Sequence, residues 1–272
     1  MTSIATNTSA VRVQYHGIKN TRIETEAFAR LSSGSRITDA SDDAAGLFIA
    51  SRMKAQISGL ERAVQNSLAG VSLVNSAEAN LNEIRNMVLR MREIAVQMAN
   101  GIYTDDPDRG FAQIEIDQLL QQIDLIAQNA NFNGVALLDG TMQNIGIQTG
   151  PTANERPSIF FKDNTTSGLQ ISSVDVTTQA NAKAAMVTLE TALTSISGEL
   201  SRAGAYENRF GHTISVLEQT AKATKMSRGR IMDADIAAES TKLSKAQVLS
   251  QANTAMLAQA NRSNSQILSL FT

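Results

Sequence analysis

The sequence predicts a mainly α-helical fold: an elongated rod of antiparallel coiled-coil or bundled helices, with a small β-hairpin region and paired terminal helices. The 272 residues contain three prolines, all between positions 107 and 157, so both long arms lack the strongest helix breaker. With 37 alanines, no tryptophan and only 4% aromatic residues, the composition favours close helix packing over one deep globular core. Apolar residues also recur at alternating spacings of three and four, as in a coiled-coil seam.

The first long helix is predicted to include residues 60–98. Its apolar positions are Leu60, Val64, Leu68, Val71, Val74, Ala77, Leu81, Ile84, Val88, Met91, Ala95 and Met98. Ser41 or Asp42 is the expected N-cap, and Asn100 followed by Gly101 is a typical stop signal. A helix over residues 60–98 would span about 58 Å, whereas a compact chain of this length has a radius of gyration of about 18 Å. The helix is too long for a compact globule, so a rod is expected.

Two further helices are predicted after the loop YTDDPDRG around Pro107. The first carries Ile116, Leu119, Ile123, Ile126 and Ala130 and ends near the turn signal Asn133-Gly134. Its short connection to the preceding helix predicts an antiparallel hairpin. The second covers residues 186–224, where only Glu207 and Thr224 interrupt the apolar spacing. Its period matches that of the first long helix, so these two helices are expected to pack along their length.

The middle of the chain has a different character. Three short β-prone runs, at about residues 143–148, 158–162 and 169–176, predict a small hairpin or a three-stranded ribbon that leans on the helices. Residues 100–180 contain ten acidic and three basic residues, a net charge of −7. This acidity is typical of a solvated end of the molecule, with chance variation along the chain as the alternative.

Both ends of the chain carry thin apolar stripes. At the N-terminus Ile4, Val11 and Ile18 recur every seven residues, and at the C-terminus the stripe comprises Ile236, Leu243, Leu249, Ala252, Met256, Ala260 and Ile267. Neither stripe can bury much surface by itself. Two interpretations remain: surface helices docked on the rod, or helices that are marginal alone and become ordered against a partner.

The composition excludes several kinds of site. Without cysteine there is no disulfide, thiolate metal site or cysteine nucleophile, and the two histidines, His16 and His212, have no neighbouring ligands and no HExxH pattern. No run of about 18 apolar residues could span a membrane, and the first 17 residues lack the pattern of a cleaved secretory signal. A net charge of −2 argues against nucleic-acid binding.

Adjacent carboxylates do not indicate catalysis here. Asp42-Asp43 and Asp105-Asp106 are interpreted as capping or loop residues, because a glycosidase needs its two carboxylates across a cleft. Asp233 and Asp235 lack the rest of an EF-hand calcium loop. No catalytic, cofactor-binding or metal-ligating residue is predicted, and the chain is not expected to be an enzyme.

Several sequence blocks occur in order over nearly the whole chain outside residues 141–175. They are RLSSGSRITDASDDAAGLFIA from Arg30, GVSLVNSAEANLNEI, LRMREIAVQMANG, FNGVALLDG, GAYENRF, RIMDADIAAES and QANTAMLAQAN…ILSLF. Together these blocks resemble bacterial flagellin, the subunit of the flagellar filament. The positions that match the family's assembly signature are Arg30, Leu31, Asp42, Asp43, Asn208, Arg209, Asp233 and Asp235.

The resemblance implies an arrangement and a function. Residues 1–44 and 233–272 would pair as helices of an inner tube, and residues 45–176 and 177–232 would form a helical rod with a β ribbon at about 141–176 and no large outer domain. The chain would polymerise through its terminal helices into an extracellular filament for swimming motility. The absence of cysteine suits a chain that is exported and assembled outside the cell.

The resemblance also implies partners. These are further copies of the chain, the flagellar type III export apparatus, a flagellin chaperone, and the filament cap and hook-junction proteins, with no nucleic acid and no membrane insertion. In flagellins recognised by the vertebrate Toll-like receptor, the contact matches Arg90, Ile94 and Glu115 here, on a surface that also packs subunits. The chain departs from the family at His16 and Gly17, and at Asn264, where a proline is common.

Three alternatives to a flagellin remain at the level of sequence. A hook–filament junction protein shares the terminal helices, although SDDAAGL and the C-terminal block favour flagellin. A surface coiled-coil adhesin or binding protein would have ordered ends as a monomer. An enzyme would need a constellation of reactive side chains, and the sequence offers none.

Overall fold

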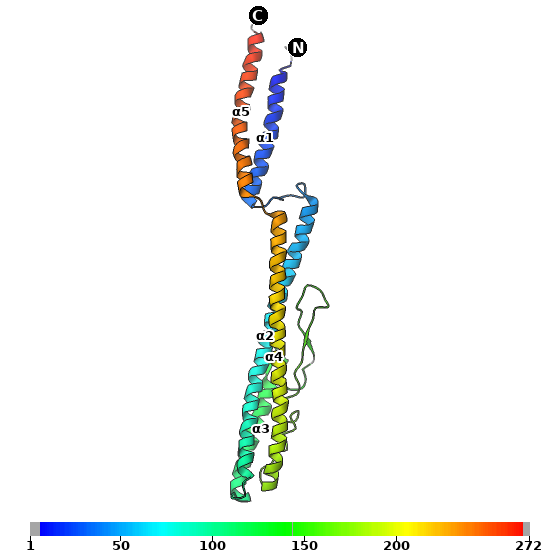
Figure 1. Ribbon diagram of the computed structural model, residues 1–272, viewed down its shortest axis with the longest axis vertical. Coiled ribbons are helices and arrows are strands. Elements are labelled where there is room, and N and C mark those ends of the chain that lie inside the picture. The colour runs from blue at the N-terminus through cyan, green and yellow to red at the C-terminus, as the bar shows by residue number, and fades with distance from the viewer. Residues whose placement is uncertain (1–5, 143, 269–272) are drawn as a thin grey trace. The chain divides into compact units, whose positions relative to one another are not determined.

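The computed structural model describes residues 6–142 and 144–268, and it confirms the mainly α-helical fold. The helices are α1 (Thr8–Ser33), α2 (Ala44–Met98), a short π-helical turn η1 (Asp105–Arg109), α3 (Gly110–Asn129), α4 (Gln179–Met232) and α5 (Ile236–Leu268), as labelled in Figure 1. The predicted stripe residue Ile4, the strand residue Gln143 and the end of the C-terminal block, residues 269–272, lie outside the described residues.

The chain divides into two compact units. The terminal unit comprises residues 1–57 and 223–272, and therefore holds α1, α5, the first part of α2 and the last part of α4. The central unit comprises residues 58–222 and holds the rest of α2 and α4 together with α3 and the strands.

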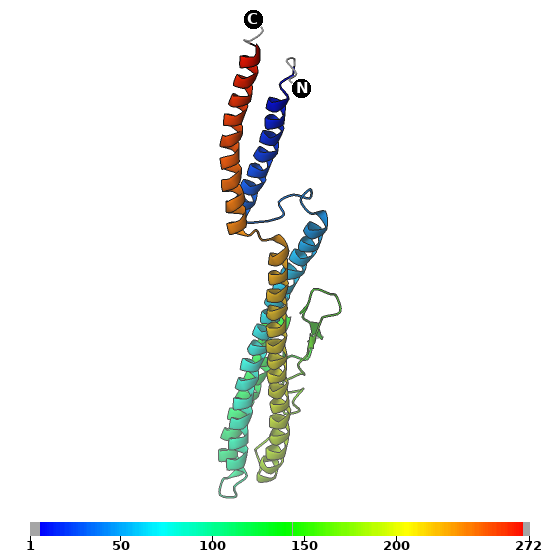
Figure 2. The ribbon, with the colours of Figure 1, turned by 45° about the horizontal axis from the view of Figure 1, so that its top comes forward.

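The core of the central unit lies between α2, α3 and α4, which run side by side in Figures 1 and 2. The predicted 3-4 stripe of α2 from Val74 onward is buried throughout, and it meets Ile116, Ile123 and Ala127 of α3. From α4 the same core receives Leu189, Ile196, Ala203 and Phe210. The predicted stripe packing of the two long helices and their hairpin partner is thus confirmed from Val74 onward. It is wrong at Leu68, which is 51% exposed while the neighbouring Ser67 is buried.

Arg109 closes the tip of the hairpin between α2 and α3. Its side chain is only 3% exposed and donates hydrogen bonds to the carbonyls of Met98 (2.9 Å), Asn100 (2.9 Å) and Tyr103 (2.7 Å). The guanidinium also pairs with the Asp105 carboxylate at 2.6 Å. Because the last carbonyls of a helix have no partner within the helix, this arginine takes the place of a C-cap for α2.

Two small antiparallel strand pairs follow α3. Strand β1 (Asn131–Phe132) pairs with β2 (Val135–Ala136) through the predicted turn, where Asn133 and Gly134 adopt positive φ angles of 50° and 78°. Such angles favour Asn-Gly in a two-residue hairpin turn. Strand β3 (Ile145–Gly146) pairs with β4 (Ser158–Ile159). The predicted hairpin between the first two β-prone runs is confirmed.

The third β-prone run, at about 169–176, is not a strand, so the three-stranded alternative is wrong. Local turns use its backbone: the Ile171 amide donates to the Thr166 carbonyl and the Val174 amide to the Ile171 carbonyl. The side-chain amide of Gln113 on α3 then accepts from the Val176 amide at 2.8 Å and donates to the Val174 carbonyl at 3.2 Å. The run buries its apolar side chains against the helices without a strand partner.

In the terminal unit, α1 and α5 lie against each other along their length (Figures 1 and 2). Gly34 ends α1 with a left-handed φ of 67°, which a glycine adopts without steric cost. Residues 34–43, called the connector below, are not helical. Helix α4 continues through Gly229 to Met232, and α5 continues past Asn264, where no proline interrupts it.

Candidate assembly site

The contact between α1 and α5 is poor in buried apolar surface. Over the whole of α1, only Asn20 and Ala27 are buried, and in α5 up to residue 266 only Glu239 and Ala246 are. Polar contacts take the place of a core: Asn20 Nδ2 donates to the Ala246 carbonyl at 2.6 Å. This helix pair therefore gains little hydrophobic stabilisation from its own folding.

The predicted terminal stripes point largely outward. On α1 the exposed apolar side chains include Val11 (58%), Tyr15 (67%), Ile18 (68%) and Phe28 (64%). On α5 they include Ile236, Val248, Leu249 and Met256. Apolar side chains gathered in the open on one helix pair make it a candidate interaction surface.

An ion-pair network joins the C-terminal end of the connector to the helix pair. Near the end of α1, the Arg30 guanidinium lies 3.6 Å from the Asp42 carboxylate and 3.7 Å from that of Glu239 in the first turn of α5. Glu239 is buried and also binds Lys242 Nζ at 2.7 Å. The structure thus brings together Arg30 and Asp42, two residues of the predicted signature. Glu239 was not singled out from the sequence, although its spacing from Asp235 is that of a first-turn acid.

The two adjacent aspartates of the connector have different roles. Asp42 Oδ2 accepts from the Thr38 amide (3.0 Å), the Thr38 hydroxyl (2.9 Å) and the Asp39 amide (3.3 Å). These hydrogen bonds, assisted by the Arg30 charge, hold the pKa of Asp42 below its ordinary value. The N-cap prediction of Ser41 or Asp42 is wrong, because Asp43 Oδ1 accepts from the Gly46 amide at 2.8 Å and caps α2.

Asp233 and Asp235 lie at the junction between α4 and α5. The Asp233 backbone pairs with Ser35 of the connector, and the Ala234 amide donates to the Gly34 carbonyl at 3.0 Å. Asp235 Oδ1 accepts from the Ala238 amide at 3.1 Å and so caps α5. Asp233 thus contributes its backbone to the junction, and Asp235 contributes its carboxylate to the start of α5.

The remaining signature residues are not part of this network. Leu31 is half-buried on α1. Asn208 and Arg209 are exposed on α4 and belong to the central unit.

The three residues predicted to contact an innate receptor differ in accessibility. Arg90 and Glu115 are about half exposed and form an ion pair, with Arg90 Nε 2.8 Å from Glu115 Oε1. This contact raises the pKa of Arg90. Ile94 is only 3% exposed and belongs to the core between the helices, so its side chain is not on the surface of the central unit.

The described part of the chain shows no metal-binding cluster. Within residues 6–142 and 144–268, no group of three or more His, Asp or Glu side chains lies close enough together to hold a metal ion. Among the described helices, none combines the length and apolar character needed to cross a membrane.

Comparison with protein families decides the relationship. Residues 4–143 match the bacterial flagellin N-terminal helical region, and residues 186–271 match the bacterial flagellin C-terminal helical region. The chain belongs to the bacterial flagellin family. It is 37% identical to the flagellar filament core protein flaB2 of Brachyspira hyodysenteriae, over 98% of this chain and 99% of that protein. It is 36% identical to a flagellin of Halalkalibacterium halodurans over 90% of each chain.

Solved structures agree with this assignment. The crystal structure of Bacillus cereus flagellin matches 56% of this chain and 88% of its own length, with a TM-score of 0.50 and 30% identity. A structure described as a flagellar hook-associated protein of Vibrio parahaemolyticus shares the fold, with a TM-score of 0.59 over 71% of this chain but only 14% identity.

Proposed function

We propose that this flagellin-family chain is the structural subunit of a bacterial flagellar filament and that its terminal helix pair carries the polymerisation contacts. The observation that carries this proposal is the near absence of a core between α1 and α5 together with their outward apolar rows. The similarity to filament core proteins over almost the full chain supports the same role. The protein is located in the flagellar filament and serves swimming motility.

The energetics favour assembly coupled to folding. Burial of one Val, Ile, Tyr or Phe side chain contributes about 1.5–3 kcal/mol. Four such side chains on α1 are more than half exposed: Val11, Tyr15, Ile18 and Phe28. In a monomer this gain is not realised, while ordering each residue costs about 1–2 kcal/mol of conformational entropy. Neighbouring subunits supply the missing apolar surface, so the terminal helices become stable in the polymer.

The domain boundaries follow from this proposal. Residues 1–44 and 233–272 form the inner layer, and residues 45–176 with 177–232 form the rod, in which the β ribbon consists of the β3–β4 hairpin. The junction at Asp233 and Asp235, where helix gives way to a short extended link, supports the boundary at 233.

The partners beyond the chain itself are inferred from the family. They are the type III export apparatus, a flagellin chaperone, the filament cap and the hook-junction proteins, with secretion to the cell exterior. Recognition by the Toll-like receptor would involve Arg90 and Glu115, whose exposed ion pair supports a polar contact there. The chain carries no catalytic role in this proposal.

Seeded elongation tests the proposal. Purified chain added to sheared filament fragments is expected to lengthen them, and a chain that lacks residues 233–272 is not. Amide hydrogens of α1 and α5 are expected to exchange quickly in the monomer and slowly in the filament. A monomer whose α1 amides are already protected, and which does not elongate seeds, would instead identify a coiled-coil adhesin.

A further inference from the structure

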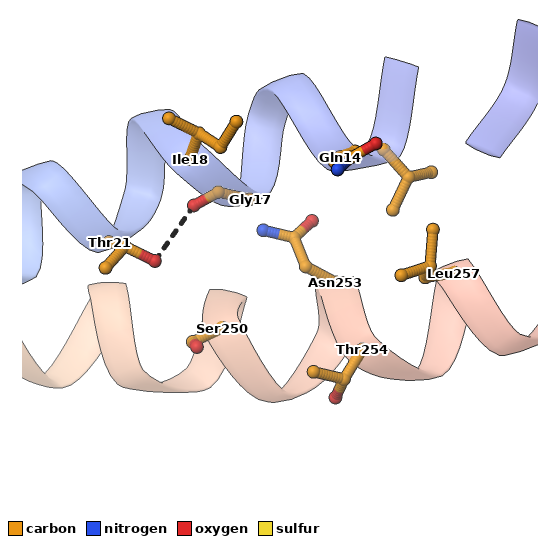
Figure 3. A pocket seen from close by; sticks show the side chains of 9 residues that line it. Gln14, Gly17, Ile18, Thr21, Ser250, Asn253, Thr254 and Leu257 are labelled. Carbon is orange, nitrogen blue, oxygen red and sulfur yellow. Dashed lines mark hydrogen bonds between the residues drawn. The ribbon is translucent and has the colours of Figure 1, made fainter. Parts of the chain in front are cut away.

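A groove on the terminal unit lies between α1 and α5 at Gly17. It has a volume of about 400 Å³, with Val13 and Ile18 of α1 and Leu257 of α5 among its lining. Figure 3 shows the side chain of Asn253 rising from α5 toward α1 in the gap below Gly17. None of the described residues that line the groove carries a charge.

The groove exists because its small residues do not fill it. A Cβ at Gly17 would meet no atom within 4 Å. The Thr21 hydroxyl turns back to the Gly17 carbonyl at 3.1 Å, as the dashed line in Figure 3 marks, and the Thr254 hydroxyl turns back to the Gln251 carbonyl at 2.7 Å. The polar groups of these residues are therefore satisfied within their own helices.

Asn253 differs from its neighbours in the helix seam. It lies seven residues from Ala246 and seven from Ala260, whose carbonyls accept from Asn20 and Asn7 of α1. Asn253 itself is half-buried and makes no hydrogen bond to any described residue. A half-buried amide can bond water in the monomer, and a protein group that replaces this water on assembly keeps the hydrogen bond.

The groove would suit an uncharged, largely apolar side chain that carries one hydrogen-bonding group. An engineered cavity of about 150 Å³ binds benzene, so the groove has room for an aromatic ring. Among the exposed large apolar side chains of the described residues, Tyr15 alone combines a ring with a hydroxyl. The other tyrosines of the chain use their hydroxyls internally: Tyr103 with Gln97 and Tyr206 with Phe160. The Tyr15 hydroxyl has no hydrogen-bond partner among the described residues.

We infer that the Gly17–Asn253 groove of one subunit receives the Tyr15 ring of a second copy of this chain, with the Tyr15 hydroxyl bonded to the Asn253 amide. The inference rests on the proposed function, because it names the contact through which the terminal helices polymerise. At about 100° per residue, Tyr15 lies about 200° around α1 from Gly17 and cannot enter its own groove. The ring centroids of Tyr15 and His16 lie 5.8 Å apart in an edge-on contact, which supports the outward orientation of the Tyr15 ring.

The separation of ring and groove determines the kind of assembly. Because the two surfaces are different, each contact leaves one subunit with a free groove and the other with a free ring. Such a heterologous contact builds an open polymer wherever the rotation between subunits does not close a ring, whereas a self-complementary contact would stop at a dimer.

Cross-linking in filaments tests the contact directly, because the chain contains no cysteine. Subunits carrying Tyr15→Cys are mixed with subunits carrying Asn253→Cys, polymerised on seeds and treated with a short bis-maleimide. Heterodimers are expected. The matched control replaces Tyr15→Cys by Arg22→Cys, which is on the same face of α1 two turns away, and is expected to give few heterodimers. Equal yields from the two mixtures would overturn the contact.

Critical concentrations for seeded growth give a second test. Tyr15→Phe and Asn253→Ala are each expected to raise the critical concentration about fivefold, and the double variant no more than either alone. Tyr15→Ala is expected to raise it more than about tenfold. Gly17→Leu raises helix propensity but fills the groove, so it is expected to weaken growth. Additive effects of the first two variants, or stronger growth with Gly17→Leu, would contradict the contact.

The two proposals fail differently. If the unmodified chain does not elongate seeds, the filament function itself is wrong. If it elongates them and the Tyr15–Asn253 cross-link is no stronger than the control, only the groove contact is wrong.

Discussion

Replacement of Arg109 by methionine tests how the helical hairpin of the central unit is closed. The substitution keeps an apolar stem of similar length and removes all donors to the carbonyls of Met98, Asn100 and Tyr103. Met98 is buried, so its carbonyl would lose its partner without access to water, at a cost of about 1–3 kcal/mol. Asn100 is exposed and Tyr103 half-buried, so their carbonyls recover water and add less. We expect a total loss of about 2–4 kcal/mol in the free energy of unfolding.

Urea unfolding followed by tyrosine fluorescence measures this loss. In a Tyr15→Phe background, both remaining tyrosines, Tyr103 and Tyr206, report on the central unit. With a urea slope of about 2 kcal/mol per molar, the expected fall in midpoint is about 1–2 M. The matched control is Arg92→Met, which removes an exposed ion pair to Glu190 and should cost less than about 1 kcal/mol.

Equal midpoints for the two arginine variants would refute the reasoning. That result would mean that water replaces the buried guanidinium at the Met98 carbonyl, and that the hairpin tip is held by its apolar contacts alone. A normal slope with a lowered midpoint for Arg109→Met, by contrast, would assign the loss to the folded state.

Three further predictions concern other polar groups. Burial and the facing Glu78 carboxylate raise the pKa of Glu207, so its contribution to stability is full below pH 4.5 and is lost as the pH rises through the folded-state pKa. Glu207→Gln should therefore raise the urea midpoint at pH 7 and reduce the fall of the midpoint with rising pH. An unchanged dependence of the midpoint on pH would contradict this. The pKa of Asp42 is lowered, so its contribution to stability is present above pH 3.8 and is lost as the pH falls through the folded-state pKa. Asp42→Asn weakens the acceptor for the Thr38 and Asp39 amides, so hydrogen exchange at these amides in filaments should be faster at pH 7. Unaltered exchange rates would count against the role of Asp42 in the connector. Asn20→Ala removes a buried hydrogen bond to α5 and should raise the critical concentration for filament growth about fivefold, whereas no change would show that this bond adds nothing to assembly.

The sequence by itself predicted the features that depend on local periodicity and local turn chemistry. Long helices follow from proline-free arms and a 3-4 apolar spacing, because both signals act within a few residues along the chain. The turn at Asn133-Gly134 was equally predictable, since positive φ angles at two adjacent positions select that residue pair. The pairing of the terminal helices was implied by the family resemblance, because their apolar stripes face largely outward and form little of the contact between them.

Only the tertiary structure decided which side chains meet groups distant in the sequence. The structure shows that Asp43 caps α2, whereas the sequence predicted Ser41 or Asp42. It also shows that Ile94 is buried between helices. The backbone of residues 169–176 forms turns and hydrogen bonds with Gln113 instead of a strand. The partners of Arg109 also depend on where a loop brings its carbonyls. The burial of Ile94 and the hydrogen bonds to Gln113 depend on contacts with residues that are distant in the sequence. Periodicity predicts which face of a helix is buried, but it does not contain the distances between helices that determine these contacts.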